Sequence, residues 1–363
     1  MQPKPNIVNL PVYQPGKPVE EVQRELGLTE VIKLASNENP FGASPNAKEA
    51  IQRELANISV YPDGGAVELT KAVARFHNVN PDQVLFGAGL DEMIALITRA
   101  YLRPGDETVM ADSTFPQYRH NAVIENATVI EVPLRNGTHD LPAMLEKITP
   151  KTRIVWICNP NNPTGTMVKK AELEAFLARV PSGVMVVLDE AYFEYVTDPD
   201  YPNGLDYLKQ YPNLLVLRTF SKIYGLASLR IGYAIGDPGV LRSINQVRGP
   251  FNTSRFAQAA ALAALEDQEF VARCREANRE GIAQLQKAFA RMGLDFFPSH
   301  GNFVLVDTGR PAQAVFEALL RKGVIVRPGH RGYPQHVRIT VGSREDNAKV
   351  IAALEEVLQE VKV

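Results

Sequence analysis

The sequence lacks most of the features that mark secreted, metal-binding or membrane proteins. Its two cysteines, Cys158 and Cys274, lie far apart and give neither a disulfide framework nor a zinc-ligand spacing. Its six histidines show no H-x-x-x-H or similar pattern, so we predict no metal site. No apolar run is long enough to span a membrane, and the polar first residues contain no apolar signal core. These absences, together with unpaired thiols, predict a cytoplasmic protein without membrane partners.

An excess of charge of one sign is also missing. The sequence has 39 Lys and Arg against 41 Asp and Glu, which gives a net charge of -2. Without a basic excess or a long block of like charge, we expect no nucleic-acid partner. The hydrophobic fraction of 45% is ordinary for a globular protein, and 363 residues are enough for about two domains.

Apolar runs that suit buried strands alternate with amphipathic stretches that suit helices through the first two-thirds of the chain. The expected strands cover residues 84–86, 108–111, 128–132, 153–158, 184–188, 214–217 and 230–235. This alternation is typical of an α/β fold with a mostly parallel sheet. A helical stretch over 254–281 looks long enough to link two domains, and after residue 293 the pattern indicates a smaller α+β unit.

The stretch from Thr219 to Arg230 follows the expected strand at 214–217 and is the richest in chemically useful side chains. Lys222 is of the residue type that forms a Schiff base with an aldehyde cofactor. Thr219, Ser221 and Arg230 are of the types that bind a phosphate through hydroxyl groups and a planar guanidinium. A lysine beside phosphate ligands suggests pyridoxal phosphate, although most lysines are simply solvated surface residues.

Other polar groups end neighbouring strands. Gly87 and Gly89 turn a strand into a helix, where free backbone N–H groups favour an anion. Asn162 lies in a loop of two prolines and a glycine, and Asp189 ends an apolar strand. A buried aspartate needs a cationic partner, such as a protonated pyridine nitrogen, although a helix cap is a common alternative. Because ligands bind at the carboxyl edge of such sheets, these groups together favour a cofactor site.

At this point the chain resembles a known family. The matching motifs, in order, are SNENPFG at 36, YPDG at 61, GAGLDE at 87, TFPQY at 114, CNPNNPTG at 158, DEAY at 189, TFSKxxGLAxLRxGY at 219 and VRIT at 337. They resemble the histidinol-phosphate aminotransferases among the fold-type I pyridoxal phosphate enzymes, and the likeness covers almost the whole chain. Three of these motifs are specific for the superfamily: the lysine segment, NPNNPTG and DEAY. The resemblance is narrowed to the histidinol-phosphate branch by the proline-rich arm at 11–18, YPDG and TFPQY.

The resemblance implies roles for residues around the cofactor ring. Lys222 would carry pyridoxal 5′-phosphate as a Schiff base and later move the proton between substrate carbon and cofactor. Asp189 would pair with the pyridine nitrogen and keep it protonated, so that the ring accepts electrons. Asn162 and Tyr192 would hydrogen-bond the phenolic oxygen of the ring. Phe115 would stack on the ring face.

The resemblance also implies a phosphate site made by Thr219, Ser221, Arg230 and the backbone at Gly89 and Leu90. The family often has GNGSDE where this chain has GAGLDE, so Leu90 lacks the hydroxyl group that serine would offer. A backbone N–H contact survives that change. We therefore expect a slightly weaker grip on the phosphate and not a lost site.

Substrate binding and assembly follow from the same resemblance. Arg327 and Arg338, which are expected near strand ends of the small unit, would bind the phosphate of histidinol phosphate or a carboxylate of glutamate. Tyr61 would reach the cofactor phosphate of a neighbouring subunit, which implies a homodimer with shared active sites. Tyr13, in the arm, would cover the substrate of the partner subunit. The plain alternative is that these arginines form surface ion pairs and these tyrosines pack on their neighbours.

The expected architecture is a fold-type I aminotransferase with a large cofactor-binding domain and a smaller domain built from N- and C-terminal segments. The expected boundaries are 1–35 for the arm and part of the small domain, 36–255 for the large domain, 256–285 for the linking helix and 286–363 for the small domain.

The leading hypothesis is transamination of L-histidinol phosphate with 2-oxoglutarate, which gives imidazole acetol phosphate and L-glutamate in histidine biosynthesis. An aromatic amino-acid aminotransferase, or an enzyme with both activities, is the first alternative, because the same pocket could hold phenylalanine or tyrosine. A phosphothreonine decarboxylase is a second alternative. A DNA-binding regulator is a third, but the motifs begin near residue 36 and the net charge is -2, so we expect no DNA-binding domain.

Overall fold

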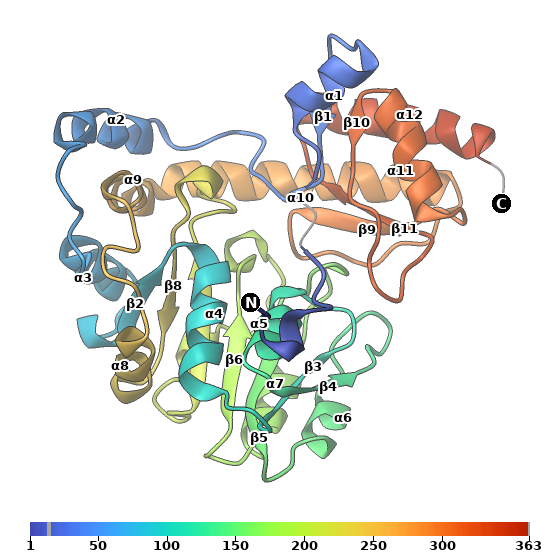
Figure 1. Cartoon of the computed structure of the whole chain (residues 1–363). Helices are drawn as coiled ribbons and strands as arrows, with labels where there is room; N and C mark the ends of the chain where they lie inside the picture. Colours follow the sequence, from blue (N-terminus) through green and yellow to red (C-terminus); the bar gives the residue numbers. More distant parts are fainter. Residues whose placement is uncertain (13–15, 362–363) are drawn as a thin grey trace.

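The computed structural model describes residues 1–12 and 16–361, and its centre is a seven-stranded sheet (Figure 1). The strand order is β2 (Val84–Gly87), β8 (Gly232–Ile235), β7 (Leu214–Thr219), β6 (Met185–Asp189), β5 (Thr152–Cys158), β3 (Glu107–Ala111) and β4 (Thr128–Val132). Strand β8 runs antiparallel to both of its neighbours, whereas the pairs from β7 to β4 are parallel. The prediction of a mostly parallel α/β sheet is confirmed.

Both faces of the sheet are buried, which explains why its strands are almost continuously apolar. Successive residues point to opposite faces. Met185 and Val187 of β6 pack with helices α4 (Gly89–Tyr101), α5 (Gln117–Ile124) and α8 (Pro238–Gln246). Val186 and Leu188 pack on the other side with α6 (Leu141–Glu146) and α7 (Lys170–Leu177). This two-sided burial leaves the strand ends as the accessible edge of the sheet.

The helical stretch expected over 254–281 is interrupted. It forms α9 (Arg255–Glu266) and α10 (Gln268–Arg291), with Asp267 between them in a non-helical conformation. The Asp267 carboxylate accepts from the backbone N–H of Phe270 and so caps the second helix, which is a usual role for aspartate. Helix α10 still runs from the large sheet to the small unit (Figure 1).

The small unit combines both ends of the chain. Strand β1 (Ile32–Lys33) pairs with β10 (Val324–Ile325), and β9 (Phe303–Asp307) pairs with β11 (His336–Thr340). Its core also contains residues of α10, α11 (Ala312–Arg321) and α12 (Arg344–Glu360). The remaining helices are α1 (Val19–Leu26), α2 (Pro45–Glu54) and α3 (Val67–His77). The N- and C-terminal composition of this unit agrees with the expected architecture, and its boundaries stay a prediction.

No helix in the described part of the chain is long and apolar enough to cross a lipid bilayer.

Candidate active site

A cavity of about 530 Å³ opens at the carboxyl ends of the parallel strands, between the large sheet and the small unit. Most of the residues predicted for the site contribute to its lining. They are Leu90, Phe115, Asn162, Asp189, Tyr192, Thr219, Ser221, Lys222, Arg230, Arg327 and Arg338. Their roles stay predictions, but the structure brings them together around one cavity.

Lys222 lies in the turn that follows β7, and its half-buried side chain lines the cavity. The Nζ atom donates a hydrogen bond to the carbonyl oxygen of Ser36 at 3.2 Å. Burial, helped by the nearby positive charge of Arg338, lowers the pKa of Lys222 to about 8. Gly225 presses this turn against the chain: a Cβ there would meet the carbonyl oxygen of Gly42 at 1.9 Å. The site therefore holds a lysine that is partly neutral near physiological pH and able to act as a nucleophile.

Asp189 ends β6 at the floor of the cavity, and it has few partners for a buried carboxylate. Its Oδ2 atom accepts from the hydroxyl of Tyr118 at 2.5 Å, and Oδ1 accepts from the N–H of Ala191 at 3.1 Å. Burial raises the pKa of Asp189 to about 6. A cation placed against this carboxylate would be strongly favoured. Tyr118, which stacks on Trp156 at 4.8 Å, was missed by the sequence analysis although it ends the TFPQY motif.

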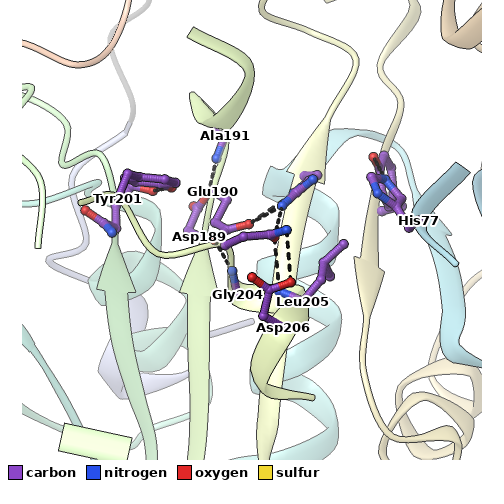
Figure 2. Close-up of polar contacts among 12 residues, drawn as sticks. His77, Asp189, Glu190, Ala191, Tyr201, Gly204, Leu205 and Asp206 are labelled. Atoms are coloured by element: carbon purple, nitrogen blue, oxygen red, sulfur yellow. Dashed lines mark hydrogen bonds and ion pairs between the residues drawn. The ribbon is translucent and has the colours of Figure 1, made fainter. Parts of the chain in front are cut away.

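The next residue, Glu190, does not line the cavity and instead takes part in a group of polar contacts (Figure 2). Glu190 pairs with Arg218 of β7 at 2.7 Å, and both side chains are almost fully buried. Glu190 also accepts from the N–H of Gly204 at 2.8 Å (Figure 2). Phe193 lies under the Arg218 guanidinium at 3.4 Å. This ion pair ties the ends of β6 and β7 together, directly behind Asp189 and Thr219.

A cationic cradle forms in the wall of the cavity, where α4 begins. The Arg230 guanidinium lies against Gly89, at which a Cβ would be 2.3 Å from Nη2. Its Nη1 atom donates to the hydroxyl of Ser221 at 3.3 Å and to the carbonyl of Ala227 at 3.0 Å. Because a helix N-terminus and an arginine meet here, the cradle suits a phosphate group. Gly89 itself has a φ of +77°, a conformation that favours glycine.

Arg338 faces the cavity from the small unit. It lies in the middle of β11 and not near a strand end, opposite Leu305 of β9. Its Nη1 atom donates to Oδ1 of Asn162 at 2.6 Å, and Nη2 donates to the carbonyl of Ala35 at 2.6 Å. The backbone of Arg327 pairs with that of Arg338 in an isolated antiparallel β-bridge, and Arg327 also lines the cavity. Two guanidinium groups on one wall make this side of the cavity suitable for a substrate anion.

The mouth of the cavity carries charges that the sequence analysis did not single out. Glu131 of β4 lies between Arg119 of α5 and Arg331, which belongs to the loop after β10. All three residues line the cavity. Their only sequence signal is charge, which surface residues share, and so periodicity could not identify them.

Of the two tyrosines predicted to reach a neighbouring subunit, the structure describes only Tyr61. Tyr61 does not contribute to the cavity of its own chain: it is 76% exposed and stacks on Phe251 at 4.7 Å. Tyr13 lies outside the described residues.

These residues fit pyridoxal phosphate. The cavity offers a lysine of lowered pKa for the aldehyde, a carboxylate in need of a cation for the ring nitrogen, and a cationic cradle for the phosphate. Each of the three groups comes from a different strand end of the same sheet.

Comparison with known proteins defines the class to which this arrangement belongs. The family model for aminotransferase class I and II matches residues 29–354, and the chain belongs to this family. Among curated proteins, the histidinol-phosphate aminotransferase of Brevibacillus brevis is 54% identical over 359 residues, which is 99% of each chain. The histidinol-phosphate aminotransferase of Bacillus subtilis strain 168 is 53% identical over 360 residues, covering 99% of this chain and 100% of the relative.

Solved structures of aminotransferases are also similar to this chain. The histidinol-phosphate aminotransferase of Sinorhizobium meliloti, solved in complex with pyridoxal-5′-phosphate, superposes with a TM-score of 0.91 at 29% identity. The match covers 98% of this chain and 97% of that one. Aspartate aminotransferase from Thermus thermophilus with maleate gives a TM-score of 0.80 at 26% identity, over 95% and 96% of the two chains. The chain therefore shares the fold of several aminotransferases.

Proposed function

We propose that this protein transaminates L-histidinol phosphate with 2-oxoglutarate in histidine biosynthesis, with pyridoxal 5′-phosphate as its cofactor. The observation that carries the proposal is the meeting of Lys222, Asp189 and Arg230 around one cavity, in a chain more than half identical to histidinol-phosphate aminotransferases. When bound, the cofactor supplies an electron sink for the carbanion formed at the substrate carbon.

The side chains of the cavity have separate tasks in this proposal. The Lys222 amino group binds the cofactor aldehyde and, once released, moves a proton at its Nζ atom. Its pKa of about 8 is suited to a group that must accept and donate a proton near neutral pH. Asp189 holds the protonated ring nitrogen, and Phe115 covers a ring face. Asn162 and Tyr192 bind the phenolic oxygen.

The phosphate end of the cofactor is held by charges and backbone. Arg230, Ser221 and Thr219 bind it, together with the N–H groups at Gly89 and Leu90. Leu90 provides no hydroxyl group, so Arg230 and the helix N-terminus carry most of this contact.

Arg338 and Arg327 bind the substrate anion. Histidinol phosphate presents a phosphate ester and glutamate presents carboxylates, and a guanidinium pairs with either through two parallel hydrogen bonds. Arg338 already donates to an oxygen acceptor on each side, Asn162 and Ala35, which fixes the plane of its guanidinium. Tyr13 of the arm contributes from the partner subunit.

The experiment that tests the substrate is a half-reaction. Cofactor-loaded protein is mixed with histidinol phosphate, and separately with phenylalanine, without a keto acid, and the visible absorbance of the cofactor is followed. Histidinol phosphate should convert the enzyme far faster at low concentration. Equal or faster conversion by phenylalanine would favour an aromatic aminotransferase instead. A spectrum unchanged by both donors would refute transamination of these substrates.

We further propose a homodimer that shares its active sites. Phe251 stacks on Tyr61, and Leu55, Ile58, Val60 and Val67, which are near Tyr61 in the sequence, are exposed in the single chain as both aromatic residues are. A monomer rarely exposes so many neighbouring apolar groups without a partner. Molar mass by light scattering tests the dimer, and Tyr61→Ala should weaken cofactor binding in it.

The unpaired buried cysteines also suit a cytoplasmic location.

A further inference from the structure

Asn37 lies between β1 and α2, where it connects the two halves of the molecule. Its side chain is buried, and its φ of +54° is in the left-handed region that asparagine tolerates better than most residues. Its backbone N–H donates to the hydroxyl of Thr340 at 3.0 Å. Its Nδ2 atom donates to the hydroxyl of Tyr192 at 2.9 Å. Asn37 therefore links a residue of the small unit to a residue of the proposed cofactor site.

Thr340 fixes which way the Asn37 amide faces. The Thr340 hydroxyl accepts from the Asn37 N–H, and it donates its own proton to Oδ1 of Asn37 at 3.0 Å. If the amide were turned over, two donors would face the Thr340 oxygen and the hydroxyl proton would lose its acceptor. A buried donor without an acceptor is unfavourable. The Nδ2 group of Asn37 is therefore held toward Tyr192.

This orientation determines what Tyr192 can do. Its oxygen accepts from Asn37 at 2.9 Å and, at a longer 3.5 Å, from Nδ2 of Asn162. Both neighbours are donors, so the hydroxyl proton of Tyr192 is directed to the remaining side, which is the cavity. Burial raises the pKa of Tyr192, so the phenol keeps this proton at physiological pH.

We propose that Asn37, oriented by Thr340, is a positioning residue that makes Tyr192 a hydrogen-bond donor toward the phenolic oxygen of the cofactor. Asn37 itself contacts neither substrate nor cofactor in this arrangement and acts through Tyr192. The inference rests on the proposed cofactor site and deepens that proposal. It explains how Asn37, which does not contact the cofactor ring, makes Tyr192, which does, a hydrogen-bond donor.

The test uses variants in which a hydroxyl or an amide is removed without adding charge. Thr340→Val releases the amide, Asn37→Gly removes it and suits the positive φ, and Thr340→Ser restores the hydroxyl. Thr308→Val is a matched control, because Thr308 is another buried threonine of the small unit and donates only to backbone carbonyls there. The pH titration of the visible absorbance of the bound cofactor is measured without substrate.

A donor on the phenolic oxygen stabilises its negative charge and lowers the titration midpoint. Thr340→Val and Asn37→Gly should therefore raise the midpoint by about one pH unit. Thr340→Ser and Thr308→Val should leave it near the wild-type value. The apoprotein of the first two variants should also bind the cofactor about threefold to tenfold more weakly in equilibrium dialysis.

A double-mutant cycle separates positioning from a general structural effect. In a Tyr192→Phe background, Asn37→Gly should leave the midpoint unchanged, because the phenol through which it acts is gone. Equal shifts in both backgrounds, or wild-type midpoints for both Thr340→Val and Asn37→Gly, would overturn the inference. Wild-type protein that takes up no cofactor would overturn the cofactor proposal and this inference together. If the protein takes up cofactor but does not react with histidinol phosphate, the proposed substrate would be wrong, whereas the inference about Asn37 would stand.

Discussion

The buried ion pair behind the active site leads to a prediction about stability and its pH dependence. Arg218→Met removes the guanidinium that lies over Phe193 and leaves Glu190 buried without its cation. Removing one partner of a buried pair costs about 3–5 kcal/mol. We expect this loss in the free energy of unfolding at pH 8, measured by urea unfolding with far-UV circular dichroism.

The sign of the pH dependence follows from Glu190. Burial already raises its pKa above the usual value, and Arg218 opposes that rise. In the variant the folded-state pKa rises further, so the fold favours the protonated acid. Stability is then retained below the unfolded pKa and lost as the pH rises through the folded value. Glu194, whose pKa burial raises to about 7, also lies near Arg218 and adds in the same direction. The deficit relative to wild type should therefore shrink at pH 5.

An exposed pair provides the control for this experiment. Arg279 and Glu276 form a salt bridge in which both side chains are 56% exposed. Arg279→Met should lower the free energy of unfolding by less than about 1 kcal/mol and show little pH dependence, because surface pairs contribute little. The reasoning is refuted if Arg218→Met costs no more than this control at pH 8, or if it costs the same at pH 5 and pH 8.

Three further predictions concern the cavity. Lys222→Ala should lower turnover by at least about a hundredfold and release the cofactor on ultrafiltration, and turnover at the wild-type rate would contradict the site. Gly89→Ala places a Cβ against Arg230, so the dissociation constant of the cofactor should rise by about tenfold or more, and an unchanged constant would show that the cradle is elsewhere. In the apoprotein, burial raises the pKa of Asp189 to about 6, so its ionised form weakens the fold as the pH rises through that value. Asp189→Asn should therefore stabilise the apoprotein by about 3 kcal/mol at pH 8 and have little effect at pH 4, as measured by urea unfolding, and equal effects at both pH values would argue against it.

The sequence predicts the sheet and most of the cavity lining because both depend on local patterns. Apolar runs mark the strands, and polar residues directly after them must meet at one edge. Asp189 and Lys222 are found in this way. Arg218, which directly follows the expected strand at 214–217, carried a comparable signal, but its buried partner could not be deduced from spacing.

Contacts between distant segments were beyond the reach of these patterns. Tyr118 binds a carboxylate 71 positions away, and Asn37 binds Thr340, which is 303 positions away. No local periodicity encodes such pairs. The break at Asp267 was missed for another reason: the flanking residues include neither glycine nor proline, and one aspartate cap interrupted an otherwise continuous helical pattern.

The short segment 35–39 has a mechanical consequence for the molecule. It offers carbonyl groups to Arg338 at Ala35 and to Lys222 at Ser36, while Asn37 holds groups from both halves. A rotation of the small unit about an axis through this segment would change these short spacings very little. The ion pair of Glu131 in β4 with Arg331 also joins the large sheet to the small unit, and such a rotation would have to break it. Movement of the small unit would therefore cost this ion pair, whereas the contacts of segment 35–39 with Lys222 and Thr340 could stay in place.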